Sequence, residues 1–511
     1  MGETLNFLDA FRLAARRKPD SLFVSYSDVR PETVSLAEIM RRGEAVGQSL
    51  IARGVRPGDV VAVMLPPWSE WLSLMVGAAF AGAVFLPVVT IYKAKELGFV
   101  LRQSKARVLV TPVSFRGVDY GQLVKACDEL PDELLHVVVG EHALPDAVRF
   151  EDLLSPGALS QPVNVSPDSF AFLVFTSGTT ADPKGVMHSA RTLLSEIDAQ
   201  AAWRGDVASE IYLSPWPPGH VAGALQLLRF LAKGTSVVAM DQWNAAEAAE
   251  LIERFRITGS SGTPFHIAGL LDAAQVGGRD LSSLRDYVLG AAPVPASVVQ
   301  RCVDAGISVV HAYGSSEHPT VTMGKASDPL ESRLNTEGRV MPGSEVLIVD
   351  DDGRVLETGS GEILTKGPEL FLGYLDDRLN QAAFATGGWY RTGDVGFLDR
   401  DGYLRITDRK KDIIIRGGEN ISSREVEDAM RTIAGITDAA AVAVKDDRLG
   451  ERVKVYVEGR DVTLDEIRQH FIALGLAKQK IPEFVERLPA LPRNATGKVL
   501  KAELRARPEP H

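Results

Sequence analysis

The amino-acid sequence predicts an α/β protein with a large N-terminal domain and a small α+β C-terminal domain. The chain has 511 residues, which is too long for one ordinary hydrophobic core. Helical segments alternate with short apolar strands up to about residue 335, as is typical of sheets covered by helices. Short strands with Gly and Asp turns follow, and the remaining stretch is long enough for a domain of its own.

Two α/β subdomains are expected in the N-terminal domain. The first extends to about residue 165, where the connector 157–168 follows, and the second extends from 170 to about 335. The strands predicted for the first are Val60–Leu65, Ala83–Val88, Val108–Thr111 and His136–Val139. Those predicted for the second are Ile211–Ser214, Ser236–Ala239 and Ser308–Val310. Such strands predict parallel or mixed sheets with helices on both faces.

A small β-barrel or sheet is predicted for residues 336–408. Alternating strands with Asp-Gly turns indicate hairpins there, at Glu345–Val349, Glu362–Thr365 and Gly402–Ile406. In the C-terminal domain we expect a helix that begins at Ser422 or Ser423 and a strand at Val453–Val457.

The segment Leu72–Ile91 is apolar and about as long as a membrane span. Two glycines and a proline interrupt it, so it is better explained as a buried helix, Glu70–Ala81, followed by a buried strand, Ala83–Val89. The sequence therefore predicts no transmembrane segment.

Composition excludes several classes of protein. A net charge of −11 argues against a nucleic-acid-binding surface. Cys127 and Cys302 lie far apart, with no metal-binding pattern and no disulfide framework, so a reducing, cytoplasmic setting is expected. The N-terminus has neither the basic start nor the apolar core of a secretory signal.

Residues 173–188 have the composition of a phosphate-binding loop. An apolar strand-like run ends at Phe175, and small hydroxyl residues and glycine follow before Lys184 and Gly185. Small residues let backbone N–H groups approach an oxyanion, and the lysine adds positive charge. The usual P-loop holds Mg²⁺ with a hydroxyl residue directly after its lysine, so here the metal must be held elsewhere. A solvated turn is the alternative, and a polar helical segment is expected after the loop.

Two further loops follow predicted strands. In the first, 216–223, His220 lies in a proline-constrained turn before an apolar helix predicted at Ala224–Leu231. The second, 290–294, consists of small residues that leave room for a flat ring. Alone, a loop histidine is more often an ordinary surface or packed residue, and a run of small residues is more often a tight turn.

The loop 311–317 combines an aromatic side chain and a carboxylate. Tyr313 can stack on adenine, and Glu317 can hold Mg²⁺ through hard oxygen ligands. His311 and His318 lie beside them, but the spacing matches no common zinc site, so Mg²⁺ is the preferred metal. A lone Tyr-Gly turn would be the ordinary explanation, and the order of these loops favours the functional one.

Charged residues stand out in the last third of the chain. Asp394 ends the stretch 388–394, where a carboxylate at a fixed turn can accept both hydroxyls of a ribose. Residues 406–421 place a run of charges between apolar strands, which is usually a solvated linker. Lys498 follows a glycine-containing loop and precedes an amphipathic terminal helix. A turn aspartate and a solvated lysine are the structural alternatives.

Over essentially its whole length, the chain resembles the adenylate-forming superfamily, in which these motifs occur in the same order. That superfamily includes acyl-CoA synthetases, aryl-CoA ligases, luciferases and peptide-synthetase adenylation domains. The chain looks most like bacterial cyclohexanecarboxylate-CoA ligases and fatty-acid-CoA ligases. Ala181 stands where the family usually has glycine or serine, and Ser423 where it often has proline. We expect both departures to have small effects.

The resemblance implies an adenylation domain at 1–409, a hinge at 410–411 and a mobile domain at 412–511. The implied catalytic residues are Lys498, Glu317, which also holds the metal, Thr176 and His220. The implied ATP- and AMP-binding residues are Thr176, Ser177, Gly178, Thr179, Thr180, Lys184, Ala291, Ala292, Pro293, His311, Ala312, Tyr313, Gly314, Ser316, Asp394 and Arg409. Lys411 would be the hinge, and the implied coenzyme A residues are Arg416, Gly417, Gly418 and Glu419. The pocket for the acid would comprise His220, Gly223, Phe265, Ala291, Val294 and Gly314.

The activity implied is that of an AMP-forming acid-CoA ligase. A carboxylate attacks the α-phosphorus of ATP, which gives an acyl-adenylate and pyrophosphate, and the thiol of coenzyme A then displaces AMP. The resemblance implies ATP, Mg²⁺ and coenzyme A as cofactors and a cyclic, aromatic or medium-chain acid as substrate. The oligomeric state stays open, with a homodimer as one option.

Three alternatives remain at this point. An adenylating enzyme that loads a carrier protein would differ only in its acceptor. A luciferase-like oxygenase would use the same fold, but nothing in the sequence marks it. A catalytically silent acyl-binding or interaction protein is disfavoured because Lys184, Glu317, Asp394 and Lys498 are all present.

Overall fold

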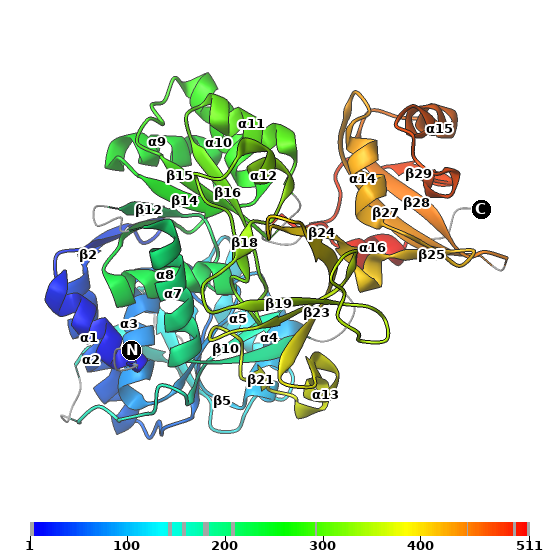
Figure 1. The fold of residues 1–511 in the computed structure, drawn as a ribbon. Coiled ribbons are helices and arrows are strands. Elements are labelled where there is room, and N and C mark those ends of the chain that lie inside the picture. Colours follow the sequence, from blue (N-terminus) through cyan, green and yellow to red (C-terminus); the bar gives the residue numbers. More distant parts are fainter. Residues whose placement is uncertain are drawn as a thin grey trace.

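The computed structural model describes residues 5–141, 146–155, 160–176, 183–205, 210–291, 294–446, 448–493 and 497–507. Two large sheets with covering helices and a smaller antiparallel sheet form one body, and the C-terminal domain stands to one side of it (Figure 1). This is the predicted fold class, with a large N-terminal domain and a small C-terminal one.

The first large sheet has the strand order β21-β11-β10-β4-β3-β5-β8-β9. Its strands are β3 (Val60–Val63), β4 (Val84–Pro87), β5 (Ala106–Pro112), β8 (Leu135–Val139), β9 (Val148–Arg149), β10 (Phe170–Thr176), β11 (Lys184–Ser189) and β21 (Gly373–Tyr374). The central strands β4, β3, β5 and β8 are parallel, and β3 and β4 are buried along their whole length. All the strands predicted for the first subdomain lie here.

The second large sheet has the order β18-β17-β16-β15-β14-β12-β13-β1-β2. Its strands are β1 (Leu22–Tyr26), β2 (Glu32–Ser35), β12 (Ile211–Ser214), β13 (Ser236–Met240), β14 (Gly259–Gly262), β15 (Asp286–Leu289), β16 (Ser308–Tyr313), β17 (Thr322–Met323) and β18 (Arg339–Val340). Strands β1 and β13 through β16 run parallel, so their carboxyl ends share one edge of the sheet.

The two sheets exchange strands. Strands β1 and β2, from the start of the chain, join the second sheet, where Phe23 pairs with Val237. Strands β10 and β11, which flank the predicted phosphate loop, join the first sheet, where Phe172 pairs with Phe85. The boundary expected near residue 165 therefore does not divide the chain into two separate sheets, because each large sheet contains strands from both sides of it.

Twelve of the described α-helices cover the two large sheets or lie beside them. They are α1 (Phe7–Arg17), α2 (Leu36–Ala52), α3 (Ser69–Ala81), α4 (Ala94–Ser104), α5 (Tyr120–Lys125), α6 (Phe150–Leu153), α7 (Ala190–Arg204), α8 (Val221–Lys233), α9 (Ala245–Phe255), α10 (Pro264–Gly277), α11 (Ala296–Asp304) and α12 (Leu330–Asn335). A two-stranded ribbon, β6 (Ser114–Phe115) and β7 (Val118–Asp119), precedes α5.

The segment that could have crossed a membrane is the predicted buried helix and strand. Every residue of α3 is buried, and β4 follows it inside the first sheet. In the described ranges, no helix combines the length and the apolar character that a bilayer crossing requires.

Residues 184–189 form a strand that the sequence did not predict. Lys184–Ser189 are β11, antiparallel to β10, and the polar helical segment expected after the phosphate loop is α7, which begins at Ala190. Thr176 and Lys184 face each other across this hairpin. Ser189 caps α7, because its side chain accepts a hydrogen bond from the Thr192 N–H. Two paired strands thus flank the predicted loop.

A five-stranded antiparallel sheet occupies the place of the predicted barrel. Its strands are β19 (Glu345–Val349), β20 (Gly361–Lys366), β22 (Phe384–Ala385), β23 (Trp389–Leu398) and β24 (Leu404–Arg409). Two short helical turns, η1 (Asp377–Leu379) and α13 (Asn380–Ala383), lie before β22. The long strand β23 pairs with both β20 and β24.

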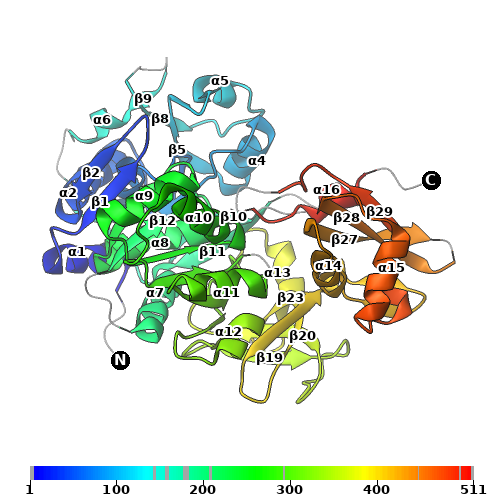
Figure 2. The same ribbon diagram turned by 90° about the horizontal axis from the view of Figure 1, so that it is seen from above.

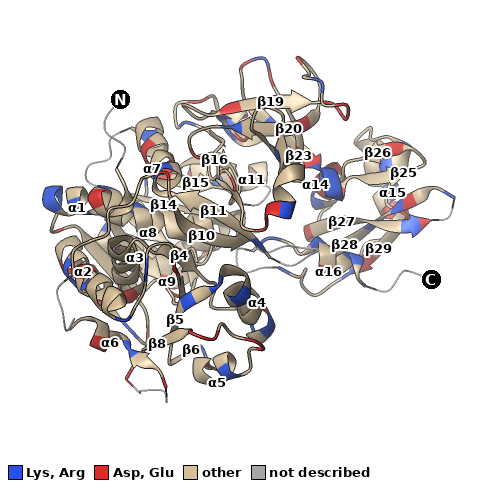
Figure 3. Cartoon of the chain, turned by 90° about the horizontal axis from the view of Figure 1, so that it is seen from below, with Lys and Arg blue, Asp and Glu red and all other residues tan. Residues whose placement is uncertain are grey.

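The C-terminal domain has its own sheet and core. After η2 (Lys410–Asp412) come β25 (Ile414–Arg416), β26 (Glu419–Ile421), α14 (Ser423–Arg431), β27 (Ile436–Asp446), β28 (Gly450–Gly459), α15 (Leu464–Ala473), η3 (Lys478–Lys480), β29 (Phe484–Arg487) and α16 (Lys501–Arg505). Val426, Val455, Ile467 and Phe471 are among its buried core residues. Figure 2 shows this domain beside the large body, with α14 facing it. In the view of Figure 3, acidic and basic segments are interspersed over both domains.

Candidate active site

Two predicted nucleotide-binding residues, Tyr313 and Arg409, contact the carboxylate of a third, Asp394. Tyr313, at the end of β16, donates its hydroxyl hydrogen bond to Asp394 Oδ2 at 2.7 Å. Arg409 ends β24 directly opposite Asp394 on β23, and its Nε lies 2.8 Å from Asp394 Oδ1. An ionised carboxylate accepts about four hydrogen bonds, so Asp394 keeps acceptor sites for two hydroxyls of a ribose.

The predicted metal ligand, Glu317, lies in the loop between β16 and β17 and is buried. The hydroxyl of Tyr374 donates to Glu317 Oε1 at 2.6 Å. Burial raises the pKa of Tyr374 well above its ordinary value, so the phenol stays a donor. The same ring faces the predicted phosphate ligand, because Lys184 Nζ lies 5.0 Å from its centroid. Tyr374 therefore contacts both the predicted phosphate lysine and the predicted metal carboxylate.

Hydrogen bonds of the residues next to Glu317 hold the loop that carries it. Ser316 offers its carbonyl to His188 Nε2 at 2.8 Å, and the Ser315 side chain accepts a hydrogen bond from the His318 N–H at 3.2 Å. At Gly314, an added Cβ would lie 1.8 Å from the carbonyl oxygen of Pro319. Glycine is thus required at Gly314 by a backbone contact, and its place in the acid pocket stays a prediction.

Part of the predicted phosphate and adenine site lies outside the described residues. This applies to Ser177, Gly178, Thr179 and Thr180 of the loop, and to Ala292 and Pro293. Thr176 is described, as the last residue of β10 and the partner of Lys184. Ala291 has a φ of 63°, a left-handed conformation that is uncommon for alanine and marks a sharp turn after β15.

Lys498 lies in the C-terminal domain. The charges of Arg409, Asp394, Lys411 and Asp412 act on its amine and change its pKa. The preceding residue lies against the start of α10, since a Cβ added at Gly497 would be 3.6 Å from Thr263 Oγ1. Burial, and then the charge of Arg409, lower the pKa of Lys498 to about 7. The predicted catalytic lysine is therefore close enough to the predicted ribose and hinge residues for their charges to act on its amine.

This lowered pKa predicts proton uptake when ATP binds. At pH 8 the Lys498 amine is mostly neutral in the free enzyme, and the triphosphate favours its charged form. We expect ATP binding to take up close to one proton at pH 8 and almost none at pH 5.5, where the amine is already charged. Calorimetry in buffers of different ionisation enthalpy measures this uptake. Lys498→Met removes it, and an unchanged uptake in that variant would contradict the assignment.

Three of the predicted acid-pocket residues, His220, Gly223 and Phe265, lie at or near the starts of α8 and α10. His220 precedes α8, and its buried Nε2 has no hydrogen-bond partner within the described ranges. Burial lowers its pKa to about 4, so the imidazole is neutral. A Cβ at Gly223 would lie 2.2 Å from the Pro217 carbonyl oxygen, so glycine lets the first turn of α8 lie against the loop that precedes it. Phe265 is 63% exposed beside the Lys498 loop.

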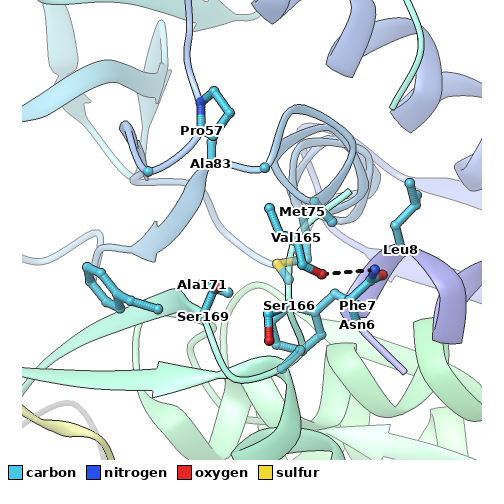
Figure 4. A pocket seen from close by; sticks show the side chains of 15 residues that line it. Asn6, Phe7, Leu8, Pro57, Met75, Ala83, Val165, Ser166, Ser169 and Ala171 are labelled. Atoms are coloured by element: carbon cyan, nitrogen blue, oxygen red, sulfur yellow. Dashed lines mark hydrogen bonds between the residues drawn. The ribbon is translucent and has the colours of Figure 1, made fainter. Parts of the chain in front are cut away.

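An apolar cavity of about 220 Å³ lies elsewhere, beneath the start of α1 (Figure 4). Phe7, Met75 and Val165 line it, and Asn6 Nδ2 donates to the Val165 carbonyl at 3.4 Å. None of the predicted acid-pocket residues lines this cavity. It is therefore separate from the site around Asp394.

The predicted coenzyme A residues form an exposed turn between β25 and β26. Gly417 and Gly418 have φ values of 60° and 88°, which favour glycine. Arg416 is held by Glu483, whose Oε1 lies 2.9 Å from Nε and 2.7 Å from Nη2. Glu419 opens β26. The described contacts do not join this turn to the Asp394 group, so its role stays a prediction.

The predicted hinge, Lys411, lies in η2. Its carbonyl accepts a hydrogen bond from Arg505 Nη2 at 3.3 Å. Just before it, Asp408 Oδ2 accepts the N–H of Ser423 at 2.6 Å, which ties β24 to the start of α14. Proline has no N–H, so the family's usual residue could not make this bond. The departure at Ser423 therefore adds a contact across the hinge.

Sequence reasoning missed Tyr374, His188 and Thr392. Tyr374 joins Lys184 to Glu317, His188 holds the Ser316 carbonyl, and Thr392 Oγ1 accepts the Asp394 N–H at 3.0 Å. Each acts through a neighbour that is distant in sequence or by a backbone bond. The local sequence alone gave no sign of these roles.

Tyr374→Phe tests the link to Glu317. The ring beside Lys184 remains, but Glu317 loses a hydrogen bond to a charged acceptor, which is worth about 1.5–3 kcal/mol. We expect the Mg²⁺ concentration needed for half-maximal pyrophosphate release to rise about tenfold. Tyr390→Phe is the matched control, since its hydroxyl lies 3.5 Å from that of Tyr374 and has the weaker contact. An unchanged Mg²⁺ dependence in Tyr374→Phe would contradict this role.

Known protein families match both domains of the chain. The model of the AMP-binding enzyme family matches residues 11–375, and that of the AMP-binding enzyme C-terminal domain matches residues 425–498. A medium-chain fatty-acid–CoA ligase of Escherichia coli (strain K12) is 32% identical over 509 residues, which cover 97% of this chain and 89% of the relative. A 3-[(3aS,4S,7aS)-7a-methyl-1,5-dioxo-octahydro-1H-inden-4-yl]propanoyl:CoA ligase of Rhodococcus jostii (strain RHA1) is 35% identical and covers 97% of both chains.

Solved structures give the same result. The o-succinylbenzoate CoA synthetase from Bacillus subtilis, in complex with its acyl-adenylate intermediate, matches with a TM-score of 0.85 and 26% identity, covering 100% of both chains. A Mycobacterium tuberculosis fatty acyl CoA synthetase matches with a TM-score of 0.78 and 28% identity, over 98% of this chain and 97% of the other. The chain therefore belongs to the AMP-binding enzyme family and is an AMP-forming acyl-CoA synthetase.

Proposed function

We propose that the chain activates a cyclic, aromatic or medium-chain acid and transfers it to coenzyme A, with the residues around Asp394 and Lys498 as the adenylation site. The convergence of Tyr313, Asp394, Arg409 and Lys498, from three strands and the C-terminal domain, carries the proposal. Relatives named for a medium-chain fatty acid, a bicyclic propanoyl group and a substituted naphthoate support this substrate class.

In the first half-reaction, a carboxylate oxygen of the acid attacks the α-phosphorus of ATP, and the bond to pyrophosphate breaks. Asp394 accepts the ribose hydroxyls and Lys184 faces the outer phosphates. Lys498 bridges the carboxylate and the α-phosphate oxygens, which compensates the charge of two anions brought together. His220, neutral at pH 7, can donate to or accept from the acid without adding charge.

Glu317 has the chemistry of a Mg²⁺ ligand. Its carboxylate is a hard oxygen donor, and Mg²⁺ is usually held by one or two carboxylates together with phosphate oxygens and water. Within the described ranges, no cluster of three or more candidate ligands occurs, which is compatible with such a site. Mg²⁺ bound there would offset phosphate charge, while Tyr374 orients the carboxylate.

In the second half-reaction, the thiol of coenzyme A attacks the acyl carbonyl carbon, and the bond to AMP breaks. We propose a division into 1–409, a hinge at 410–411 and 412–511, with rotation about Lys411 exposing the Gly417–Gly418 turn to the adenylate. The described cysteines, Cys127 and Cys302, are both free, which supports a reducing compartment such as the cytoplasm.

Pyrophosphate release with ATP, Mg²⁺ and a panel of acids tests the proposal. The panel contains alicyclic, aromatic and straight-chain acids, each assayed with and without coenzyme A, and Lys498→Met is the inactive control. We expect release with one acid class, accelerated by coenzyme A, together with an acyl-CoA product. Release with polar acids only would overturn the proposed substrate class.

A carrier protein is the second candidate acceptor. A fatty acid–[acyl-carrier-protein] ligase of Streptomyces coeruleorubidus is 30% identical over 491 residues. Pyrophosphate release without acyl-CoA, but with acylation of a pantetheinylated carrier, would favour this acceptor. Equal rates with both acceptors would show that the thiol arm alone is recognised.

A further inference from the structure

Behind the Glu317 loop lies a group of buried polar side chains that we call the rear layer. It consists of His188, Glu196, His318, Thr320, Thr365 and Glu369, each no more than 4% exposed. Alternate loop residues face it: Ser316 and Thr320 form hydrogen bonds on this side, as does His318, whose Nδ1 lies 3.0 Å from Thr365 Oγ1. Glu317, between them, contacts Tyr374 on the other side.

Two carboxyl groups lie next to each other in the rear layer. Glu196, from α7, interacts with Glu369, which follows β20. Thr320 Oγ1 donates to Glu196 Oε1 at 2.6 Å, and Gln200 donates to the same oxygen. Glu196 Oε2 and both oxygens of Glu369 have no hydrogen-bond partner in the described part of the chain. A buried oxygen without a partner is costly, so these groups require compensation.

The surroundings supply no positive charge. Among the described residues, no lysine or arginine forms an ion pair with Glu196 or Glu369, and His318 Nε2 lies 3.6 Å from Glu369 Oε2. Burial lowers the pKa of both His188 and His318 to about 4, so neither is charged at neutral pH. Two ionised carboxylates would therefore repel each other without a counter-ion.

We propose that Glu196 and Glu369 share one proton and that the pair positions the Glu317 loop for adenylation. The proton lies between Glu196 Oε2 and a Glu369 oxygen, which gives both a partner. The other Glu196 oxygen stays free to anchor Thr320, three residues after Glu317. Glu196 and Glu369 are thus positioning residues, and this role rests on the proposed function of Glu317.

The environment of the pair agrees with a retained proton. Burial, and then the charge of Glu369, raise the pKa of Glu196 to about 8, and burial raises the pKa of Glu369 to about 7. Interacting carboxyls titrate as a pair. When the last proton leaves at alkaline pH, repulsion separates the carboxylates and releases Thr320 and His318. Glu317 would then lose its position.

The first test compares pH profiles. In the wild-type enzyme, loss of the shared proton should lower kcat/KM for Mg·ATP about tenfold per pH unit above about pH 8, in addition to the decrease caused by deprotonation of Lys498. Glu369→Gln places a permanent donor beside Glu196, so the ratio of variant to wild-type activity should rise about tenfold between pH 8 and 9.5. Both proteins retain Lys498, so its titration cancels in that ratio. A constant ratio would overturn the proposal.

Glu70→Gln is the matched control. Glu70 is also a buried glutamate whose pKa burial raises, but it lies on α3 and pairs with Arg30. We expect this variant to keep the wild-type pH profile. An identical flattening in Glu70→Gln would overturn the assignment to the rear layer, because it would show a general effect of removing a buried carboxyl.

The second test does not depend on catalysis. At pH 7 ordinary carboxyls are ionised, so the infrared difference between wild type and Glu369→Gln should contain the carbonyl stretch of one protonated carboxyl, lost above pH 9. Glu196→Gln should lose the same band, and the band in wild type alone reports the proton if a variant does not fold. Absence of the band would overturn the shared proton.

A cation could also compensate the pair. Activity that requires K⁺ or Na⁺ in wild type, but not in Glu369→Gln, would replace the proton by a bound ion and overturn the proposal. If no acid in the panel is activated, the infrared band still decides whether the proton exists. Failure of the ligase assignment is then distinguishable from failure of the shared proton.

Discussion

Lys498→Ala is expected to abolish adenylation and to spare the second half-reaction. Lys498 lies in the C-terminal domain, the charges of Asp394 and Arg409 act on its amine, and we expect the amine to act only while two anions are brought together. Loss of such a preorganised charge typically lowers the rate by about 10²–10³. Acid-dependent exchange of pyrophosphate into ATP should fall by this factor. Formation of acyl-CoA from supplied acyl-adenylate should stay within about threefold of wild type.

Lys445→Ala is the matched control for this experiment, because Lys445 is an exposed lysine of the same domain, on β27. It should leave both half-reactions unchanged. Equal loss of both half-reactions in Lys498→Ala would contradict the prediction that Lys498 acts in adenylation only. It would mean that the lysine holds the nucleotide or the domain in both steps.

Asp394→Ala is expected to remove most of the affinity for the nucleotide. The carboxylate would lose two hydrogen bonds to ribose hydroxyls, each worth about 1.5–3 kcal/mol for a charged acceptor. The Kd for ATP should therefore rise at least about 100-fold. Tyr313 and Arg409 would also lose their partner. We expect the free energy of unfolding to decrease by about 1–3 kcal/mol, because the Tyr313 hydroxyl is left buried and unsatisfied.

Asp401→Ala provides the comparison for Asp394. Asp401 is an exposed aspartate in the turn between β23 and β24, so its loss should affect neither affinity nor stability. Nucleotide binding by calorimetry and thermal unfolding should be measured on the same preparations. A normal Kd for ATP in Asp394→Ala, with reduced stability only, would make Asp394 a structural residue and move the ribose site elsewhere.

Much of the site could be predicted because its residues occur in short stretches with recognisable chemistry. Tyr313, Glu317, Asp394 and Lys498 each stand in a stretch of turn residues beside an apolar strand. Their common location could not be derived from any one stretch. It depends on the pairing of Asp394 with Arg409 across two strands and on the placement of a separate domain.

Other features depend on contacts that leave no local pattern. Strands β1 and β10 each pair on one side with a strand that is distant in sequence, β13 and β4 respectively. Strand β11 is not among the predicted strands, and it is defined by its pairing with β10 and β21. Glu196 and Glu369 each look like a surface glutamate in sequence, and only the packing of α7 against the segment after β20 buries them.

The bond between Asp408 and Ser423 bears on the timing of catalysis. It joins a strand of the large body to the first turn of α14, and the Ser423 hydroxyl adds a second contact, to Asp408 Oδ1, at 3.2 Å. If the domain rotates about Lys411, both contacts must break in every turnover. The chain then carries a small kinetic barrier that a proline-containing relative lacks. That barrier would lengthen the lifetime of the adenylate before the thiol arrives.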